Sequence, residues 1–361
     1  MTQLSSRPHP IRVLIADDSA FMRTAIRRMV ESDPAIQVVA TAQDGKEALE
    51  KVQELQPDVV TLDVEMPRLN GLDTLRSIMK SAPRPVIMIS SLTQEGAETT
   101  LDALDAGAFD CIPKQLSYAS LDIVKIKQDL LSKIHAAAQS RRAARPVSEP
   151  IPRSTLPPPR TAGRLRLPPA IIALGTSTGG PKALQQILPL IPKELPVGIL
   201  IVQHMPLGFT GPFARRLDNL CQITVREATS NEPIEPGVVY IAPAGMHMTV
   251  WRRSPSRFAL RIGPEPLHTL HTPSVDVMML SVAEVYRSLA MGIILTGMGA
   301  DGALGMKAIK AAGGYTVGQD EASCAVYGMP RSCAEAGVLG KVVPLMQVPD
   351  EITQALGCSR A

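Results

Sequence analysis

One serine of this chain lies in a setting typical of enzymatic nucleophiles. The apolar run AIIAL is followed at residues 175–180 by GTSTGG, in which Ser177 completes the pattern G-x-S-x-G. PKALQQILPLI comes next with apolar residues at helical spacing, so Ser177 lies where a strand turns into a helix. Such a turn exposes the hydroxyl and directs the helix N-terminus towards it, where a developing oxyanion is stabilised.

The motif alone leaves other interpretations open. G-x-S-x-G arises by chance, a glycine-rich turn between strand and helix can hold a phosphate, and Ser177 could simply cap the helix. A dinucleotide site is a weaker alternative, because GTSTGG lacks the G-x-G-x-x-G spacing. A serine hydroxyl reacts poorly until a base takes its proton, so the decision depends on a histidine and an acid.

Only one of the six histidines, His204, ends a strongly apolar run, GILIVQH. The carboxyl ends of parallel strands share one edge of a sheet, so this histidine is expected beside Ser177. Of the others, His9 lies in the N-terminal tail and His135 lies near a linker. Structural roles are expected for the three that open a hairpin strand or lie in the polar stretch PLHTLHTP, namely His247, His268 and His271.

The candidate acid is Asp301, which follows the apolar run MGIILTG in a glycine-rich stretch before a helical pattern. Capping that helix is the alternative role, but the glycines also allow backbone amides to approach a ligand closely. Three strand ends then bring Ser177, His204 and Asp301 to one edge. Geometry and not chain order defines a catalytic triad, so His204 is the expected base and Asp301 its orienting acid. Backbone amides near Thr178 and Met298 are the expected oxyanion donors.

A second cluster of reactive residues lies near the N-terminus. VLIADDSAFMR places Asp17 and Asp18 at the end of the first apolar run, and VTLDVEMPRLNG places Asp63 at the end of the third. Three neighbouring carboxylates repel one another unless a cation lies among them, and oxygen ligands with room for water suit Mg²⁺. Beside such an ion, the Asp63 carboxylate could attack a phosphoryl group.

Two further strand ends fit phosphoryl chemistry. Ser90 ends the run VIMISS and could meet a phosphoryl oxygen, and Lys114 follows in CIPK as a compact cation. The alternative is that Asp17 and Asp18 cap a helix and Asp63 lies in a turn. Four strand ends that carry DD, D, S and K in that order argue against that alternative.

The elements that must position these residues form two regions. Over residues 11–138, short apolar runs alternate with helical patterns, which predicts a doubly wound α/β domain with a parallel, flavodoxin-like sheet. Residues 139–169 are rich in proline and arginine and are expected to form a solvated linker. Residues 170–355 predict a second doubly wound parallel sheet, with a β-hairpin formed by HMTVWR and FALRIG.

Composition excludes several classes of function. The net charge is only +3 and aromatic residues make up 3% of the 361 residues, so neither nucleic-acid binding nor a stacking site is expected. The N-terminus lacks the apolar core of a signal peptide, and no apolar run approaches the length of a membrane span. No membrane insertion is therefore expected. The five cysteines are scattered without CxxC spacing, which indicates reduced thiols and a cytoplasmic protein.

Residues 11 to about 135 resemble a response-regulator receiver domain, through the residues DD, D, S and K at the four strand ends. The resemblance implies that Asp63 accepts phosphate from a histidine kinase. It also implies that Mg²⁺ is held by Asp18, Asp63 and the backbone carbonyl of Glu65, with help from Asp17, and that Ser90 and Lys114 detect the phosphorylated state. One departure is Cys111, where many receivers carry an aromatic switch residue.

Residues 170–355 resemble the catalytic domain of the chemotaxis methylesterase family CheB, through GTSTGG, QHM and TGMGADG. The resemblance implies the triad Ser177, His204 and Asp301, with Met298 as an oxyanion donor and no cofactor for the esterase. The implied substrates are glutamate methyl esters on the cytoplasmic helices of chemoreceptors, and receptor glutamines that are deamidated at the same site.

The order of the two regions implies a regulated enzyme. In the resembled family the unphosphorylated receiver covers the catalytic site, and phosphorylation weakens that contact. Two alternatives remain open from the residues themselves. The second domain could be a binding module without catalysis, or a serine hydrolase acting on small esters or lipids. Labelling with a serine-directed fluorophosphonate would separate the enzyme from the binding module.

Overall fold

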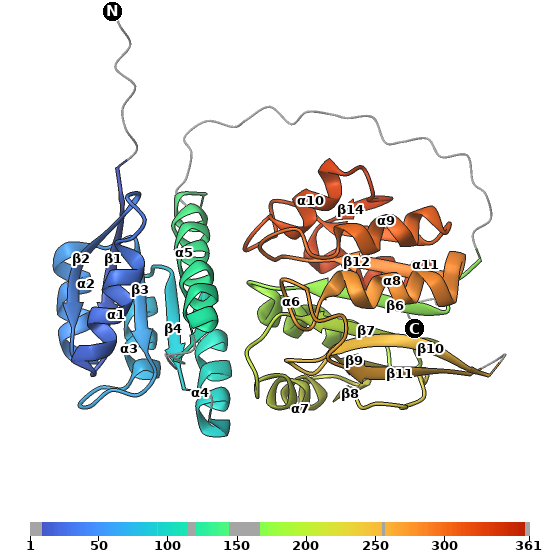
Figure 1. Ribbon diagram of the computed structural model, residues 1–361, viewed down its shortest axis with the longest axis horizontal. Helices are drawn as coiled ribbons and strands as arrows, with labels where there is room; N and C mark the ends of the chain where they lie inside the picture. The colour runs from blue at the N-terminus through green and yellow to red at the C-terminus, as the bar shows by residue number, and fades with distance from the viewer. Residues whose placement is uncertain (1–8, 92, 115–119, 144–166, 255–256, 358–361) are drawn as a thin grey trace, which may run out of the picture. The chain divides into compact units, whose positions relative to one another are not determined.

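The computed structural model describes residues 9–91, 93–114, 120–143, 167–254 and 257–357. These residues form two compact units, one in the N-terminal part of the chain and one in the C-terminal part (Figure 1). Most of the predicted linker, residues 144–166, lies outside the described residues. No helix in the described part of the chain combines the length and the apolarity that a membrane crossing requires.

The N-terminal unit is a parallel five-stranded sheet with the order β2-β1-β3-β4-β5, as the alternation of apolar runs and helices predicts. The strands are β1 (Ile11–Ala16), β2 (Ile36–Ala42), β3 (Val59–Asp63), β4 (Val86–Ser90) and β5 (Asp110–Pro113). The helices are α1 (Ala20–Val30), α2 (Gly45–Leu55), α3 (Gly71–Ser81), α4 (Gln94–Asp105) and α5 (Ser120–Ala143). Strands β3 and β4 are buried along their whole length, because helices cover both faces of the sheet.

Side-chain caps begin four of these helices. Ser19, Asp44, Asn70 and Thr93 each accept a hydrogen bond from a backbone N–H in the first turn of the helix that follows. The cap of α1 is therefore Ser19, and neither Asp17 nor Asp18 is consumed in this role. The capping alternative for these two acids is thus wrong.

Helix α5 extends past the domain boundary predicted at residue 138. It continues to Ala143, through the first residues of the predicted linker. The expected boundary followed the change of composition at Gln139, but glutamine, arginine and alanine are all good helix formers, so QSRRA can continue the helix.

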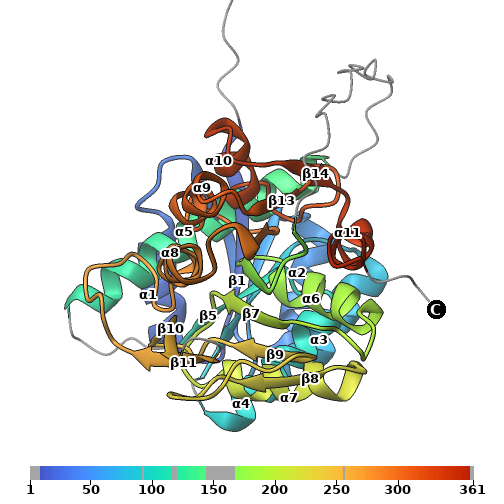
Figure 2. The same cartoon turned by 90° about the vertical axis from the view of Figure 1, so that its right-hand side faces the viewer.

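The C-terminal unit contains a seven-stranded parallel sheet with the order β14-β13-β12-β6-β7-β9-β8. Its strands are β6 (Ile171–Thr176), β7 (Gly198–Gln203), β8 (Thr224–Glu227), β9 (Val238–Ile241), β12 (Ala290–Ile294), β13 (Tyr315–Gln319) and β14 (Lys341–Val343). The helices are α6 (Gly180–Ile187), α7 (Thr210–Leu220), α8 (Val275–Tyr286), α9 (Ala303–Ala311), α10 (Met329–Glu335) and α11 (Val348–Ala355). Helices α8 and α9 lie on one face of this sheet, and α6 and α11 lie on the other (Figure 2).

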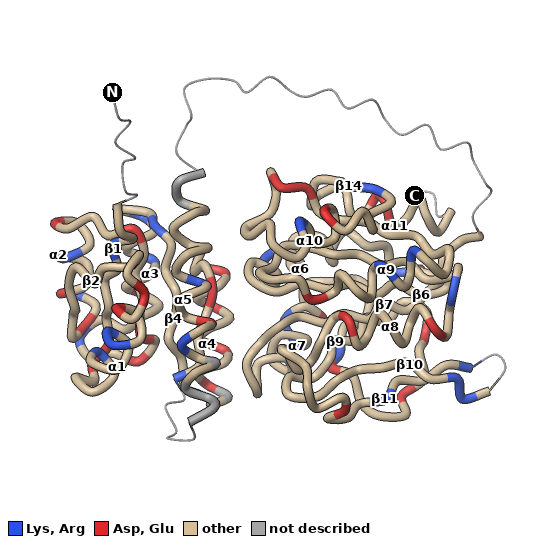
Figure 3. The backbone as a smooth tube through the Cα atoms, turned by 45° about the horizontal axis from the view of Figure 1, so that its top comes forward, with Lys and Arg blue, Asp and Glu red and all other residues tan. Residues whose placement is uncertain are grey.

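The predicted hairpin is present as β10 (His247–Ser254) and β11 (Arg257–Gly263), which pair antiparallel. Its inner face packs on α8 through Met248, Val250 and Leu260, which belong to the same buried cluster as that helix. Arginines gather at its outer end (Figure 3). The first residue of β10, His247, enters the site described next.

Candidate active sites

Ser177 follows β6 directly, in a turn that leads into α6. Its backbone N–H donates to Thr296 O at 3.1 Å, and its carbonyl accepts from Gly180 N at 2.8 Å, which closes the turn. Gly179 has φ +78°, a conformation that L side chains rarely adopt, and an added Cβ would lie 2.5 Å from Ala325 Cβ. The glycines of GTSTGG therefore hold the serine in a sharp turn at the carboxyl end of the strand.

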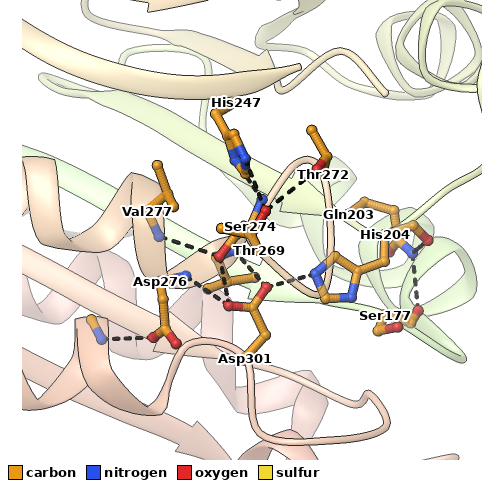
Figure 4. Close-up of polar contacts among 12 residues, drawn as sticks. Ser177, Gln203, His204, His247, Thr269, Thr272, Ser274, Asp276, Val277 and Asp301 are labelled. Atoms are coloured by element: carbon orange, nitrogen blue, oxygen red, sulfur yellow. Dashed lines mark hydrogen bonds and ion pairs between the residues drawn. The ribbon is translucent and has the colours of Figure 1, made fainter. Parts of the chain in front are cut away.

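His204 follows β7, the neighbour of β6 in the sheet. Its backbone N–H donates to Thr176 O at 3.2 Å. A backbone hydrogen bond therefore links His204 to the residue that precedes Ser177. The buried side chain of Gln203 adds two further bonds, since its Nε2 donates to Ser177 O at 3.0 Å and to His204 O at 2.9 Å. This amide fixes the position of the serine turn relative to the histidine (Figure 4).

Asp301 contacts the histidine from the opposite side to Ser177 (Figure 4). Its Oδ2 lies 2.8 Å from His204 Nε2. The same carboxylate accepts from Ser274 Oγ at 2.8 Å and from the N–H groups of Val275 at 2.7 Å and Asp276 at 2.9 Å. Asp301 does not cap α9, whose N-cap is Gly302; it lies instead at the N-terminus of α8, where the helix dipole favours an anion.

These contacts determine the charge of Asp301. Burial alone would favour the neutral acid, but the imidazole of His204 and the backbone donors of α8 outweigh it and hold the pKa of Asp301 well below its usual range. A carboxylate that accepts from Nε2 requires the hydrogen of neutral His204 to be on that nitrogen. Nδ1 is buried and has no hydrogen-bond partner among the described residues, so it is the nitrogen that can accept a proton.

Sequence reasoning missed three residues of this network. His247, for which a structural role is expected, accepts from Ser274 N–H at 3.2 Å through its Nδ1, next to Asp301. His271, for which a structural role is also expected, stacks its ring on His204 with a centroid distance of 4.1 Å. Ser274 was not identified. All three lie in or beside polar loops without periodicity, so the sequence carries no signal that could have found them.

The predicted oxyanion donors flank the serine turn. Thr178 is buried, and its carbonyl accepts from Thr296 Oγ1 at 3.0 Å. Met298 follows Gly297, which packs so closely on Ser177 that an added Cβ would lie 2.9 Å from the Ser177 Cβ. The backbone amides of Thr178 and Met298 stay predictions as oxyanion donors.

The N-terminal unit gathers its predicted acids at the carboxyl edge of the sheet. Carboxylate oxygens of Asp17, Asp18 and Asp63 all lie within 4.8 Å of one another. Lys114 Nζ lies 2.7 Å from Asp63 Oδ2, 3.3 Å from Asp17 Oδ2 and 4.0 Å from Asp18 Oδ1. Burial raises the pKa of Asp63 to about 6, with a further contribution from Asp17, and Lys114 only partly offsets this. One lysine does not balance the negative charge of three carboxylates, so this cluster fits a divalent cation of the Mg²⁺ type, which prefers oxygen ligands.

The other two predicted receiver residues differ in their placement. Glu65 N–H donates to Asp63 Oδ1 at 3.4 Å, so the Glu65 backbone lies beside the acid cluster. Ser90 instead has its hydroxyl oriented towards α4, where it lies 3.2 Å from Gly96 O and accepts from Thr100 Oγ1 at 2.6 Å. The structure therefore brings Glu65 to Asp63 and leaves the Ser90 hydroxyl bound to α4.

Comparison with known proteins gives matches for both units. The family model for CheB methylesterase matches residues 172–352, and that for response regulator receiver domains matches residues 13–124. A protein from Symbiobacterium thermophilum named protein-glutamate methylesterase/protein-glutamine glutaminase is 48% identical, over 96% of this chain and 98% of its own length. A protein of the same name from Nitratidesulfovibrio vulgaris is 47% identical over 96% of this chain and 99% of its own length.

One solved structure is similar to the C-terminal unit. The CheB methylesterase catalytic domain of Thermotoga maritima is 37% identical and has a TM-score of 0.50. The similarity covers 52% of this chain and 99% of the Thermotoga domain.

Proposed function

Because this chain belongs to the CheB methylesterase family and carries a response-regulator receiver domain, we propose that Ser177 is the nucleophile of its esterase reaction, with His204 as the base and Asp301 as the acid that orients it. The chain is a phosphorylation-activated protein-glutamate methylesterase and protein-glutamine glutaminase, which removes methyl esters from chemoreceptor glutamates and deamidates receptor glutamines.

In the first half of the reaction, Ser177 Oγ attacks the ester carbonyl carbon while its proton moves to His204 Nδ1. Asp301 stabilises the imidazolium through Nε2–H, and the backbone amides of Thr178 and Met298 receive the oxyanion. The intermediate then collapses, the bond to the methoxy oxygen breaks, and the Nδ1 proton leaves with methanol.

In the second half, water attacks the acyl-enzyme and passes its proton to Nδ1. The ester bond to Ser177 breaks, Nδ1 returns the proton to Oγ, and the glutamate side chain is released as a carboxylic acid that loses its proton to solvent. With a glutamine substrate the same route releases ammonia in place of methanol. Every proton transfer uses one nitrogen of His204, so this scheme needs no cofactor.

In the receiver domain, Asp63 accepts a phosphoryl group from the kinase histidine. Asp18, Asp63 and the backbone carbonyl of Glu65 would hold Mg²⁺, with Asp17 assisting, and the bound ion would neutralise charge that develops on the phosphoryl oxygens. Lys114 contacts Asp63 at 2.7 Å and would pair with the phosphorylated side chain, while Ser90 would have to turn from α4 to reach it.

The partners follow from these two reactions. A histidine kinase supplies phosphate, and the cytoplasmic helices of methylated chemoreceptors supply the ester. We place the protein in the cytoplasm without membrane insertion, and we propose no nucleic-acid partner. The free thiols of Cys111, Cys221, Cys324 and Cys333 agree with a reducing compartment.

The observation that carries this proposal is the pairing of His204 Nε2 with an Asp301 carboxylate held by three further donors, next to the Ser177 turn. The test is methanol release from methylated receptor, with and without acetyl phosphate, by wild type and Ser177→Ala. Acetyl phosphate should stimulate wild type, and Ser177→Ala should be inactive under both conditions. Release by Ser177→Ala at more than a tenth of the wild-type rate would contradict the assignment.

A further inference from the structure

His271 lies against the imidazole of His204. The two ring centroids are 4.1 Å apart and the ring planes differ by 21°. We propose that His271 is a positioning residue whose ring fixes the plane of the general base, so that Nδ1 faces Ser177. This inference rests on the role proposed above for His204.

The general base needs a second restraint because Asp301 holds only one of its atoms. The hydrogen bond at Nε2 fixes the position of that nitrogen, but a single bond allows the ring plane to tilt around it. Nδ1 has no hydrogen-bond partner among the described residues that could stop this motion. A flat ring stacked on one face of the imidazole restricts this tilt. The hydrogen bond and the stacked ring together therefore fix the direction in which Nδ1 points.

Stacking can orient His204 only if the loop that carries His271 is itself held, and His247 anchors it. His247 is 1% exposed, and burial lowers its pKa. Its Nδ1 accepts from Ser274 N–H, which places its hydrogen on Nε2, 3.1 Å from Thr269 Oγ1. On the other side of His271, Thr272 O accepts from Gly245 N at 3.1 Å.

The two restraints on His204 therefore share one support. Ser274 donates through its hydroxyl to Asp301 and through its backbone N–H to His247. The bond to Asp301 supports the carboxylate that holds Nε2 of His204. The bond to His247 supports the loop that carries His271, whose ring covers one face of His204. We expect changes in this loop to affect the chemical step more than substrate binding.

The test compares His271→Ala, His271→Leu and His271→Phe in the full-length protein with acetyl phosphate, using methanol release from methylated receptor. Misplacement of the base should lower kcat about 10- to 100-fold in the Ala and Leu variants, with KM within twofold of wild type. Phenylalanine keeps a flat ring and should restore kcat to within about threefold of wild type. His268→Ala is the matched control, since His268 lies in the same loop but is exposed, and it should retain wild-type kcat.

Two outcomes would overturn the inference. Wild-type kcat in His271→Ala would show that the stack does not orient the base, and an equal loss in the Ala and Phe variants would assign the effect to the nitrogens of His271. Ser177→Ala is measured beside them, so that an active Ser177→Ala variant identifies a failure of the proposed catalytic residues. Fluorescence of Trp251, the only tryptophan, checks that each variant is folded.

Discussion

Asp63 is a buried carboxylate and Asp301 a largely buried one, each at the carboxyl edge of a parallel sheet, and their surroundings are opposite. Asp63 is crowded by Asp17 and Asp18, and Lys114 is its main cationic partner. Asp301 accepts hydrogen bonds from His204 and from three groups at the start of α8. Burial raises the pKa of Asp63 to about 6, whereas these donors overcome burial and hold the pKa of Asp301 well below its usual range.

The difference separates a reacting carboxylate from a supporting one. The charge of Asp301 is already compensated, so it can stabilise an imidazolium without rearrangement and has little tendency to react. The charge of Asp63 is poorly compensated, so a cation or a covalent phosphoryl group changes its energy strongly. Similar places in two similar folds thus give different chemistry, because the neighbours of the carboxylate differ.

The largest expected effect comes from Asp301→Asn. Ser274 Oγ and Asp276 N–H, which both bond Oδ1, would occupy the amide oxygen and leave the NH₂ group at the Oδ2 position, facing Nε2 and the Val275 N–H. The imidazole hydrogen would then move to Nδ1, and the base would be lost. We expect methanol release to fall about 10³- to 10⁴-fold at neutral pH. Asp276→Asn is the matched control, because Asp276 accepts from Gly305 N and its carboxylate does not contact His204. Equal losses of methanol release in Asp301→Asn and Asp276→Asn would show that Asp301 has no special role beside His204.

The stabilities of Asp63→Asn and Asp301→Asn should change with opposite signs. Without Mg²⁺, Asp63→Asn should raise the free energy of unfolding of the receiver by about 3 kcal/mol above pH 6, because the folded pKa of about 6 exceeds the unfolded one. This gain should disappear as pH falls to about 4. Asp301→Asn should destabilise the catalytic unit by about 1–3 kcal/mol above pH 4, and the loss should shrink at lower pH, since the folded pKa of Asp301 is depressed.

Scanning calorimetry can follow both units, and Trp251 fluorescence identifies the transition of the catalytic one, because the chain has a single tryptophan. Changes of the same sign in the two variants would show that the two carboxylates do not differ as described.

The two sites should also be coupled in function. Asp63→Asn should remove stimulation by acetyl phosphate, and deletion of residues 1–143 should raise basal methanol release about 5- to 150-fold, the range of common coupling energies. The cut follows Ala143 so that α5 is removed whole. A truncated enzyme no faster than the unphosphorylated full chain would exclude inhibition by the receiver.

The smallest effect is expected for Ser274→Ala, which removes one of the four donors to Asp301 and the N-cap of α8. The free energy of unfolding should fall by about 1–2 kcal/mol, and methanol release should fall about 3- to 10-fold. Ser281→Ala in the same helix removes an acceptor for Val250 N–H without touching Asp301, so it should keep wild-type activity. A similar loss of activity in both variants would refute a specific role for Ser274.

The sequence could predict the ends of the strands and the residues found there. Apolar runs locate β3, β6 and β7, so Asp63, Ser177 and His204 follow from counting along them. Asp301 was also found, although it lies seven residues beyond β12, because glycines mark its loop. These predictions need only the rule that parallel strands share a carboxyl edge.

The contacts between loops could not be predicted in this way. Asp301 was expected either to orient the base or to cap α9, and nothing in the residues around it indicates the N-terminus of α8, which begins 26 residues earlier. His271 and Ser274 lie in a loop that is held by hydrogen bonds to His247 and Gly245, which are distant in the sequence. The orientation of Ser90 towards α4 depends on a hydroxyl rotamer, which no residue pattern encodes.

The orientation of the His204 ring also decides which inhibitors can reach it. Chymotrypsin-type proteases use the distal nitrogen, Nε2, as the base, and there the acid holds Nδ1. In this protein Asp301 covers Nε2, so in the proposed mechanism the base is the nitrogen next to Cγ, closer to the backbone. An alkylating substrate analogue would therefore have to place its electrophilic carbon deeper and nearer the main chain than reagents designed for those proteases.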